Sequence, residues 1–288
     1  MLDIYKEGSI SRISPEAPVP VLLNTHDIYA AGGAGNVAVN LASMGCEITL
    51  AGIIGNDKEG EILKSIIHEQ NIAFRYLISK QAPTISKTRI ISAGKHLVRI
   101  DKELSFENES GVLFDSVKDL DPGYVVISDY NKGTLSDIRN IIFQYRKKNI
   151  KVFVDPKRSM EHYRGAWLIK PNKTEFERYV GTYNNDSEIV MKGRQALLDN
   201  DIEHMLVTLG AKGMIYINHT DHEIIPARSL KVYDITGAGD TVISTLVYEV
   251  AKGNTIRNAI VRSRDMAGIS VSHFGTYVIK PSDMQEYS

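Results

Sequence analysis

Residues 234–241 read Asp-Ile-Thr-Gly-Ala-Gly-Asp-Thr, and apolar residues follow them at the spacing of a helix. Val242, Ile243 and Leu246 begin this apolar series, which ends before Gly253. The glycines therefore open a predicted helix, and the N–H groups of its first turn have no partners within the helix. Such a turn favours an anion, and three consecutive small residues let a ligand approach the backbone closely. This pattern predicts a phosphate-binding turn.

Asp240 lies in the first turn of the predicted helix, where the helix dipole favours the ionised carboxylate. Beside an anion site, a carboxylate can accept a proton from an attacking hydroxyl group while backbone amides hold the phosphoryl group. The loop alone fits a second interpretation nearly as well, in which the glycines only start a helix with a favourable acidic residue in its first turn. No Gly-Lys-Ser/Thr sequence follows, so the loop is not a Walker A motif.

Strand-like runs rich in Val, Ile and Tyr alternate with segments of helical spacing along most of the chain. This alternation is typical of βαβ units and predicts an α/β fold with a mainly parallel sheet. Polar residues follow three of the predicted strands, at 128–130, 155–157 and 171–173, which is where open α/β sheets bind ligands. The predicted strands are residues 48–54, 125–128, 152–155, 167–170 and 205–209, and the predicted crossover helices are 136–148 and 188–198.

Two segments depart from this alternation and together predict a small β lid on the α/β core. Residues 11–23 contain three prolines, which suit an edge or lid strand because proline lacks the N–H group that a central strand donates. Residues 84–102 alternate loosely in polarity about a turn expected at Gly94-Lys95, which is the pattern of a β-hairpin.

A second glycine-rich helix start lies at residues 32–36, which read Gly-Gly-Ala-Gly-Asn. Asn36 and Asn40 lie four residues apart, on one face of the predicted helix, and their amides suit sugar hydroxyls because they both donate and accept hydrogen bonds. Residues 33–38 also fit the G-x-G-x-x-A pattern of dinucleotide sites. That pattern follows a strand, whereas residues 24–30 form a polar run, so we disfavour a dinucleotide site.

Two further turns fit either a nucleotide site or a structural role. Asn172 and Glu175 match a capping box at the start of a helix, and the same pair can order the waters of Mg²⁺ and nucleotide phosphates. Residues 207–213 form a glycine-rich turn between two predicted strands. Capping is the simpler interpretation of the first motif when it is taken alone.

The composition excludes several classes of protein. Hydrophobic residues make up 43% of the 288 residues, which is typical of globular chains, and the formal net charge of −1 argues against a broadly basic surface for nucleic acid or membrane. The single Cys46 excludes an intramolecular disulfide and a cysteine-cluster metal site. No apolar run approaches the ~20 residues that span a bilayer, and no signal-peptide pattern opens the chain, so we expect a cytoplasmic protein.

Together these motifs resemble the ribokinase-like carbohydrate kinases of the phosphofructokinase B type. The resemblance runs from Gly32-Gly33 through Asn172-x-x-Glu175 to residues 234–241, almost the whole chain. It implies a three-layer, Rossmann-like, mainly parallel sheet with a small β lid.

The resemblance also implies how the chain is organised and what it binds. Residues 1–288 would form one kinase domain, with lid segments at about 4–24 and 84–102. ATP and Mg²⁺ would be its cofactors, with a monovalent cation near the loop that begins at Asp234. The lid would pair with its twin in a homodimer.

The resemblance assigns roles to the residues that match the family's motifs. The residues implied for the reaction are Asp240 as base and Gly237, Ala238 and Gly239 as the anion hole. Those implied for the sugar hydroxyls are Asp3, Gly32, Gly33, Asn36 and Asp129. Those implied for the nucleotide are Asn172, Glu175, Thr208, Gly210 and Gly213, with Glu175 also ordering Mg²⁺ through water. For a phosphate group on the substrate, the ranked candidates are Arg89, Arg99, Lys132 and Arg12.

Within the family, residues 1–3, 12–20, 128–133 and 155–157 are similar to the kinases that phosphorylate the anomeric oxygen of D-glycero-β-D-manno-heptose 7-phosphate, a precursor of the lipopolysaccharide core. The implied partners are this sugar phosphate and ATP, without nucleic acid or membrane. Two alternatives stay open. One is another sugar or sugar-phosphate kinase of the family, and the other is a catalytically impaired sugar-phosphate-binding protein, suggested by the unusual Arg-Ser-Arg-Asp sequence at 262–265.

The sequence departs from the family pattern at both ends. Family members begin with a buried strand that ends in Gly-Asp just before the position of Met1, so we expect a chain with native upstream residues to be more stable and more active. Many relatives carry a carboxyl-terminal nucleotidyltransferase domain, which these residues do not include. We therefore expect no adenylyl transfer from them.

Overall fold

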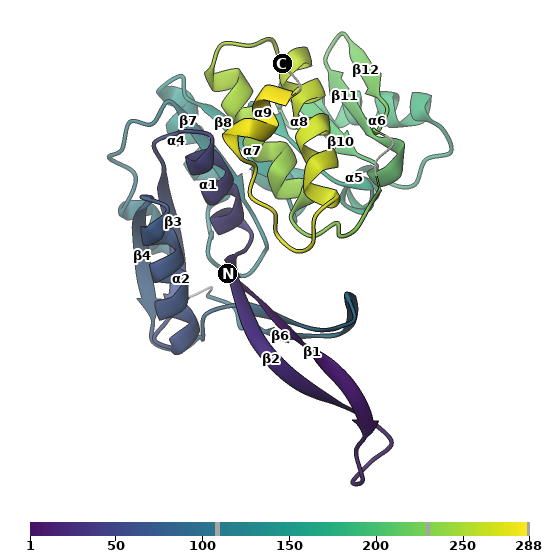
Figure 1. Ribbon diagram of the computed structural model, residues 1–288. Helices are drawn as coiled ribbons and strands as arrows, with labels where there is room; N and C mark the ends of the chain where they lie inside the picture. The colour runs from purple at the N-terminus through teal and green to yellow at the C-terminus, as the bar shows by residue number, and fades with distance from the viewer. Residues whose placement is uncertain (107–109, 229–230, 287–288) are drawn as a thin grey trace.

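The computed structural model describes residues 1–106, 110–228 and 231–286 (Figure 1). Its strands are β1 (Leu2–Ile13), β2 (Pro20–Ala31), β3 (Thr49–Gly55), β4 (Ala73–Ser79), β5 (Ser86–Ser92), β6 (Lys95–Lys102), β7 (Tyr124–Ser128), β8 (Lys151–Asp155), β9 (Leu168–Ile169), β10 (His204–Thr208), β11 (Met214–Asn218) and β12 (His222–Ile225). Its helices are α1 (Ala34–Ser43), α2 (Lys58–Glu69), α3 (Ser110–Asp115), α4 (Ile138–Lys147), α5 (Lys173–Val180), α6 (Asp186–Asp199), α7 (Ala238–Ala251), α8 (Ile256–Val271) and α9 (Pro281–Glu286), with 3₁₀ turns η1 (Met160–Tyr163) and η2 (Gly210–Lys212).

The main sheet has six strands in the order β12-β11-β10-β9-β8-β7. The four strands from β7 to β10 run parallel, and β11 and β12 continue the sheet in antiparallel pairs. The parallel pattern expected from alternating strands and helices is therefore confirmed. The predicted helices 136–148 and 188–198 correspond to α4 and α6.

Helices cover both faces of this sheet, which gives three layers. Along β8, Val152 and Val154 pack into one apolar cluster with α4 and α6, while Phe153 between them packs into a second cluster with α1, α7 and α8. Successive side chains of a strand point to opposite faces, so a strand that is buried on both faces is apolar throughout. This is why β8 lacks the polar alternation of a half-exposed strand.

A second sheet has the order β2-β1-β5-β6, and its β1–β2 ribbon extends away from the three layers (Figure 1). The predicted hairpin is observed as β5 and β6, although its turn lies one residue earlier than expected, at Ala93-Gly94. Both residues have positive φ, 49° and 70°, as a tight hairpin turn of this hand requires. Lys95 is already the first residue of β6.

The polar run at 24–30 was wrongly predicted to be free of strand. These residues belong to β2, which leads directly to Gly32 and pairs antiparallel with β1. The pattern of the sequence hides this strand because a ribbon that extends into solvent does not need an apolar face. The strand lies in the second sheet, outside the parallel sheet.

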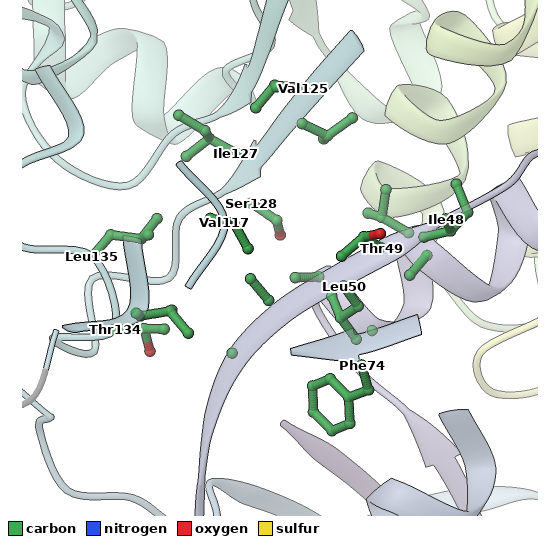
Figure 2. Close-up of a pocket in the computed structure, with 18 of the residues that line it drawn as sticks. Ile48, Thr49, Leu50, Phe74, Val117, Val125, Ile127, Ser128, Thr134 and Leu135 are labelled. Atoms are coloured by element: carbon green, nitrogen blue, oxygen red, sulfur yellow. The ribbon is translucent and has the colours of Figure 1, made fainter. Parts of the chain in front are cut away.

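The parallel strands of the core form two separately hydrogen-bonded pieces. β3 pairs with β4 in a two-stranded parallel sheet, and within the described part of the chain no strand connects β3 to β7. A cavity of about 830 Å³ lies between these two strands (Figure 2).

Candidate active site

The candidate site lies where the carboxyl ends of the parallel strands meet the start of α7. Asp155 ends β8, Asp129 follows β7, and the N–H of Asp129 donates to the carbonyl oxygen of Asp155 at 3.0 Å. Lys170 follows β9, and its Nζ lies 3.2 Å from Asp155 Oδ1. α7 brings Asp240 to the same edge. The topology therefore gathers charged groups from four separate parts of the sequence.

Asp240 is buried, with 6% of its surface exposed. The side-chain amide of Asn36 donates to its Oδ2 at 2.9 Å, and the hydroxyl of Tyr130 donates to its Oδ1 at 3.4 Å. These two contacts hold the carboxylate in place from α1 and from the turn after β7.

Burial raises the pKa of Asp240 from its ordinary value of 3.8 to about 7. The negative charges of Asp155 and Asp3 raise this pKa further, while the Asn36 hydrogen bond and the positive charge of Lys170 lower it. A carboxyl group with a pKa near neutrality is matched to general base catalysis, because it accepts a proton readily and a large fraction of it is ionised at physiological pH.

The glycine-rich turn before Asp240 is closely packed against its neighbours. Gly237 caps α7 with a φ of 78°, and a Cβ atom there would lie 2.8 Å from the Asn36 amide nitrogen. At Gly239 a Cβ would lie 3.3 Å from Lys170 Nζ, which makes Lys170 a close neighbour of the turn. The first-turn N–H groups of α7 and this ammonium group together form a positively polarised surface beside Asp240.

Lys170 and Asp155 are not among the predicted site residues. Lys170 is 2% exposed and Asp155 is 7% exposed, so the pair is buried. The available signal was a charged residue at the end of a buried strand in each case. Tyr130 lies in the turn at 128–130, where ligand binding was expected, but no role was predicted for its side chain.

The end of the second sheet that leads into α1 brings together Asp3, Gly32 and Gly33. Asp3 is 4% exposed and accepts a hydrogen bond of 2.6 Å from Arg89 Nη1. A Cβ at Gly32 would lie 2.5 Å from Asp3 Oδ2, and one at Gly33 would lie 2.8 Å from Tyr130 Cε2. The two glycines therefore let the start of α1 approach Asp3 and Tyr130.

Asn36 and Asn40 share one face of α1, as predicted, but their amides already have partners. Asn40 Nδ2 donates to Asn36 Oδ1 at 3.0 Å, and Asn40 Oδ1 accepts from the N–H of Ile279 at 2.9 Å. Asn36 in turn donates to Asp240. In this geometry Asn36 orients Asp240, a contact that spacing along the sequence does not reveal.

Asp129 lies in a dense polar network. Its Oδ1 accepts from the N–H of Asn131 at 2.8 Å, and its Oδ2 accepts from the Tyr163 hydroxyl at 2.7 Å. Arg158 Nε lies 3.1 Å from the same Oδ2. These contacts fix the turn after β7, which also carries Tyr130.

The four candidate cations are widely separated. Arg89 is buried against Asp3, and Lys132 Nζ contacts Glu103 Oε1 at 2.6 Å beside the cavity of Figure 2. Arg99 pairs in register with Arg89, but its side chain is 56% exposed and bonds to Asp101. Arg12 lies exposed on β1, nine residues beyond Asp3, a distance of about 30 Å along the strand. The fold therefore does not bring Arg12 to Asp3 within one chain.

The predicted capping box is present. Asn172 Oδ1 accepts from the N–H of Glu175 at 2.9 Å, and Glu175 Oε2 accepts from the N–H of Asn172 at 2.8 Å. Lys157 contacts the other oxygen of Glu175, which is only 3% exposed. The capping box accounts for the start of α5. The buried carboxylate of Glu175 also lies next to the ammonium group of Lys157.

Thr208, Gly210 and Gly213 lie together after β10, next to Asn172. Thr208 forms an isolated bridge with Asn172, and its N–H donates to the carbonyl oxygen of Pro171 at 3.0 Å. Gly210 has a φ of 59° and is exposed, whereas a Cβ at Gly213 would lie 2.1 Å from the carbonyl oxygen of Ile225. All five residues that were predicted to bind the nucleotide therefore lie together at the carboxyl ends of β9 and β10.

Across the described residues, no group of three or more His, Cys, Asp and Glu side chains is arranged to hold a metal ion. Mg²⁺ is usually held by one or two carboxylates together with waters and substrate phosphates, so a single buried carboxylate such as Glu175 is compatible with a Mg²⁺ ion that arrives with a nucleotide. In the same part of the chain, no helix combines the length and apolar character needed to cross a membrane.

Curated relatives match the chain over nearly its full length. The bifunctional protein HldE of Haemophilus influenzae (strain PittEE) is 39% identical over 292 aligned residues, which cover 99% of this chain and 61% of that protein. The bifunctional protein HldE of Alcanivorax borkumensis is 39% identical over 290 residues, with the same coverage. The chain thus spans about three fifths of the length of these relatives.

Solved structures share the fold. Phosphofructokinase-2 from Escherichia coli in complex with potassium aligns with a TM-score of 0.82 and 20% identity, covering 99% of this chain and 94% of that chain. Ribokinase from Thermotoga maritima aligns with a TM-score of 0.75 and 18% identity, covering 99% and 95%. These neighbours confirm the predicted three-layer, ribokinase-like α/β fold.

The model of the pfkB family carbohydrate kinases matches residues 4–283. This match and the curated relatives cover the same stretch of chain, including the turn before Asp240. Phosphoryl transfer from ATP to a sugar is the class of reaction that follows. The chain belongs to the pfkB family of carbohydrate kinases.

Proposed function

We propose that this chain transfers the γ-phosphoryl group of ATP to O1 of D-glycero-β-D-manno-heptose 7-phosphate. The observation that carries the proposal is the buried Asp240 in the first turn of α7, whose pKa is raised to about 7. The resemblance of residues 12–20 to heptose 7-phosphate kinases supports the choice of sugar. The 1,7-bisphosphate product would serve lipopolysaccharide core synthesis.

In the proposed reaction, Asp240 accepts the proton of the O1 hydroxyl as O1 forms a bond to the γ-phosphorus. The bond between that phosphorus and the β,γ-bridging oxygen breaks, and ADP leaves with the electron pair. The backbone of Gly237, Ala238 and Gly239 would stabilise the charge on the transferring group, with Lys170 Nζ close by. Asn36 holds the base in position.

The sugar site and the nucleotide site would be formed by different elements of the fold. Asp3, Gly32, Gly33 and Asp129 would line the sugar site, and among the four candidate cations Arg89 contacts Asp3. Asn172, Thr208, Gly210 and Gly213 would line the nucleotide site. Mg²⁺ would neutralise charge on the phosphates, and Glu175 would order its waters.

A monovalent cation near the loop that starts at Asp234 is a further part of the proposal. Asp234 Oδ1 accepts from the N–H and the hydroxyl of Thr236, at 2.9 and 2.7 Å, and its Oδ2 accepts from the N–H of Gly275 at 3.1 Å. These bonds fold the loop tightly just before the anion-binding turn. One structural neighbour was solved in complex with potassium.

The second sheet would serve as the lid and as the contact between two copies of the chain. It exposes several large apolar side chains, and contiguous patches of such side chains mark interaction surfaces. These residues are Ile13, Leu23, Ile28, Leu97, Val98 and Ile100. A homodimer that pairs the two sheets would cover them.

The proposal is tested by ADP release with heptose 7-phosphate, fructose 6-phosphate, ribose and adenosine as acceptors. We expect turnover that depends on the heptose phosphate, and loss of at least a hundredfold of kcat in Asp240→Asn with sugar binding retained. Turnover with another acceptor alone would assign the chain to a different member of the family. Calorimetric binding of sugar phosphate without ADP formation would instead identify an impaired binding protein.

The segment at 262–265 does not favour that impaired alternative. Asp265 is buried and contacts Arg264 at 2.7 Å and Arg228 at 3.5 Å, and Arg262 Nε lies 3.7 Å from Glu249. These charges are paired within and around α8, so the segment has a structural explanation.

A further inference from the structure

Glu175 is a buried carboxylate with one oxygen bonded to the backbone and one oxygen turned toward a cation. The residue is 3% exposed, and its Oε2 accepts from the N–H of Asn172 at 2.8 Å within the capping box. That hydrogen bond fixes the carboxylate at the start of α5. Oε1 is therefore the atom through which Glu175 can neutralise a positive charge.

The positive charge at Oε1 is the ammonium group of Lys157. Lys157 Nζ contacts Oε1 directly, and 33% of the lysine side chain is exposed, against 4% of the Glu175 side chain. A buried carboxylate that lacks a partner is costly, so the ammonium group stabilises Glu175. A Mg²⁺ ion that bound here with a nucleotide would need the same oxygen, because the other oxygen is already bonded.

The backbone that carries Lys157 is held firmly, although its side chain is long and unbranched. The N–H of Lys157 donates to the Tyr163 hydroxyl at 2.9 Å, and the N–H of Arg158 donates to the same oxygen at 2.8 Å. Tyr163 is 0% exposed and donates in turn to Asp129 Oδ2 at 2.7 Å. The four-carbon stem of the lysine lets the ammonium group move while this backbone stays in place.

Lys157 also reaches the side of the site that carries the proposed base. Its Nζ lies 5.7 Å from the centre of the Tyr130 ring, within the range of a cation–π contact. The Tyr130 hydroxyl donates to Asp240 Oδ1 at 3.4 Å. Lys157 therefore lies between Glu175, at the nucleotide end of the site, and the tyrosine that contacts the base.

A second buried polar group lies one helical turn after Glu175. Within the described chain, the Tyr179 hydroxyl is buried and has no hydrogen-bond partner. Burial raises the pKa of this hydroxyl, and the negative charge of Glu175 raises it further, as expected for residues four apart on one helix face. Buried polar groups usually have a partner, and a water on a bound metal ion would supply one here.

We propose that Lys157 is an exchangeable cation on Glu175, which it releases when a nucleotide brings Mg²⁺ to Oε1. Two cations on one carboxylate oxygen repel each other strongly, so Lys157 leaves Oε1 as the ion binds. The released ammonium group then turns to the phosphate oxygens that arrive with the ion, since lysine binds phosphate as a point charge. The inference rests on ATP as the phosphoryl donor, as in the proposed function, and not on the identity of the sugar.

The test measures binding of AMP-PNP, a non-hydrolysable ATP analogue, by calorimetry in Mg²⁺ and in EDTA, without sugar. The Kd in EDTA divided by the Kd in Mg²⁺ gives the preference for the metal complex. Lys157→Met removes the ammonium group and keeps the apolar stem, so the bare charge of Glu175 repels metal-free phosphates. We expect this ratio to rise at least tenfold. The control is Lys173→Met, which removes a 58% exposed lysine 3.8 Å from Glu177 and should leave the ratio within twofold.

Glu175→Gln supplies the second arm of the test, because glutamine can complete the capping box but carries no charge to exchange. Adding Lys157→Met to this variant should change the ratio less than twofold. In EDTA without nucleotide, Lys157→Met alone should lower Tm by about 5 °C or more, and the double variant should recover most of the loss. If Lys157→Met does not fold, Lys157→Gln takes its place, because its amide can donate to Glu175 without neutralising it.

An unchanged ratio in Lys157→Met would overturn the proposal. Both Kd values would rise equally if Lys157 were a fixed phosphate contact, and neither would change if its ion pair were permanent. A rise of the same size in the Glu175→Gln background would also overturn it, because the exchange needs the charge of Glu175. A tenfold rise without turnover of the heptose phosphate would support the exchange and reject only the proposed sugar. Absence of AMP-PNP binding in both conditions would overturn the exchange and the proposed function together.

Discussion

The side-chain amide of Asn36 donates a 2.9 Å hydrogen bond to Asp240 Oδ2, which joins two residues 204 positions apart in the sequence. Both side chains are buried, with 1% and 6% of their surfaces exposed. A hydrogen bond to a carboxylate in such surroundings favours the ionised form. Asn36 therefore influences the pH range in which Asp240 can act as a base.

Replacing Asn36 with Ala should move the pH dependence of the reaction. The Asn36 hydrogen bond lowers the pKa of Asp240, so its removal lets that pKa rise above about 7. We expect the acid limb of kcat/KM to shift upward by about one pH unit, since a bond to a charged group contributes ~1.5–3 kcal/mol.

Asn40→Ala is the matched control for this variant. Asn40 is an equally buried amide on the same helix face, but its side-chain hydrogen bonds are with Asn36 and Ile279 rather than with Asp240. It should lower Tm and leave the acid limb in place. The same shift in both variants would show that Asn36 acts only through packing.

The Asp240→Asn variant should be more stable than the unmodified chain at alkaline pH. In the unfolded chain Asp240 ionises near its ordinary pKa of 3.8, and in the folded chain near 7. Between these values the unfolded state binds fewer protons, so this group makes stability fall as pH rises, and the loss is complete above pH 7. Asparagine cannot ionise and avoids the loss.

Urea unfolding at pH 4, 6 and 8 measures this effect. The free energy of unfolding of Asp240→Asn should exceed that of the unmodified chain by up to about 4 kcal/mol at pH 8, and by little at pH 4. A difference that does not change with pH would contradict the raised pKa.

Arg89 and Arg99 offer a comparison between two cations that pair in register. Arg89→Ala leaves the buried Asp3 without its partner, and breaking a buried ion pair costs about 3–5 kcal/mol of stability. We also expect the KM for the sugar phosphate to rise at least tenfold, with the KM for ATP unchanged. Steady-state kinetics and thermal unfolding measure the two effects.

Arg99→Ala is the control, because its side chain is 56% exposed and its contact with Asp101 is open to solvent. Exposed ion pairs contribute little to stability. We expect nearly unchanged Tm and KM. A larger rise in sugar KM for Arg99→Ala than for Arg89→Ala would assign the substrate phosphate to Arg99 instead.

Glu175→Gln separates the capping role of this residue from a role with Mg²⁺. Glutamine also completes a capping box, so α5 should keep its start while the negative charge beside Lys157 is lost. We expect the Mg²⁺ concentration for half-maximal rate to rise about tenfold, with unchanged circular dichroism. Glu177→Gln, on the same helix and 3.8 Å from Lys173, should leave the Mg²⁺ requirement as it is. If neither variant changed the Mg²⁺ requirement, Glu175 would have a capping role only.

The Val98→Lys/Ile100→Lys double variant should weaken the proposed homodimer. The two residues lie on one face of β6 and are 53% and 57% exposed. Lysine side chains at these positions can therefore extend into solvent in the monomer, but in a dimer that pairs the two sheets they would place like charges against each other. Sedimentation should show the dimer dissociating at a concentration at least tenfold higher. Met191→Lys changes an equally exposed residue of α6 and should have no effect. If the double variant dimerised as well as the unmodified chain, this sheet would not form the dimer interface.

Most of the main elements could be predicted from local patterns. The glycine-rich turn at 234–241 opens α7 with Gly237 as its cap, and the Asn172–Glu175 box starts α5, because both depend on backbone groups within a few residues. The hairpin of β5 and β6 was displaced by one residue only. The lid segment predicted at about 4–24 includes the start of β2, but residues 24–31 of this strand were missed because the exposed ribbon lacks the apolar alternation on which strand prediction depends.

The sequence by itself determined the class of fold, the helix starts and the acidic residue in the first turn of α7, since these follow from spacing and from the chemistry of adjacent residues. Only the tertiary structure decided that Asn36 holds Asp240, that Lys170 and Asp155 are buried next to Gly239, and that Arg12 lies far from Asp3. It also decided that β3 and β7 are separated by an apolar groove. These relationships join residues far apart in the chain, and burial sets their energies, so no local pattern contains them.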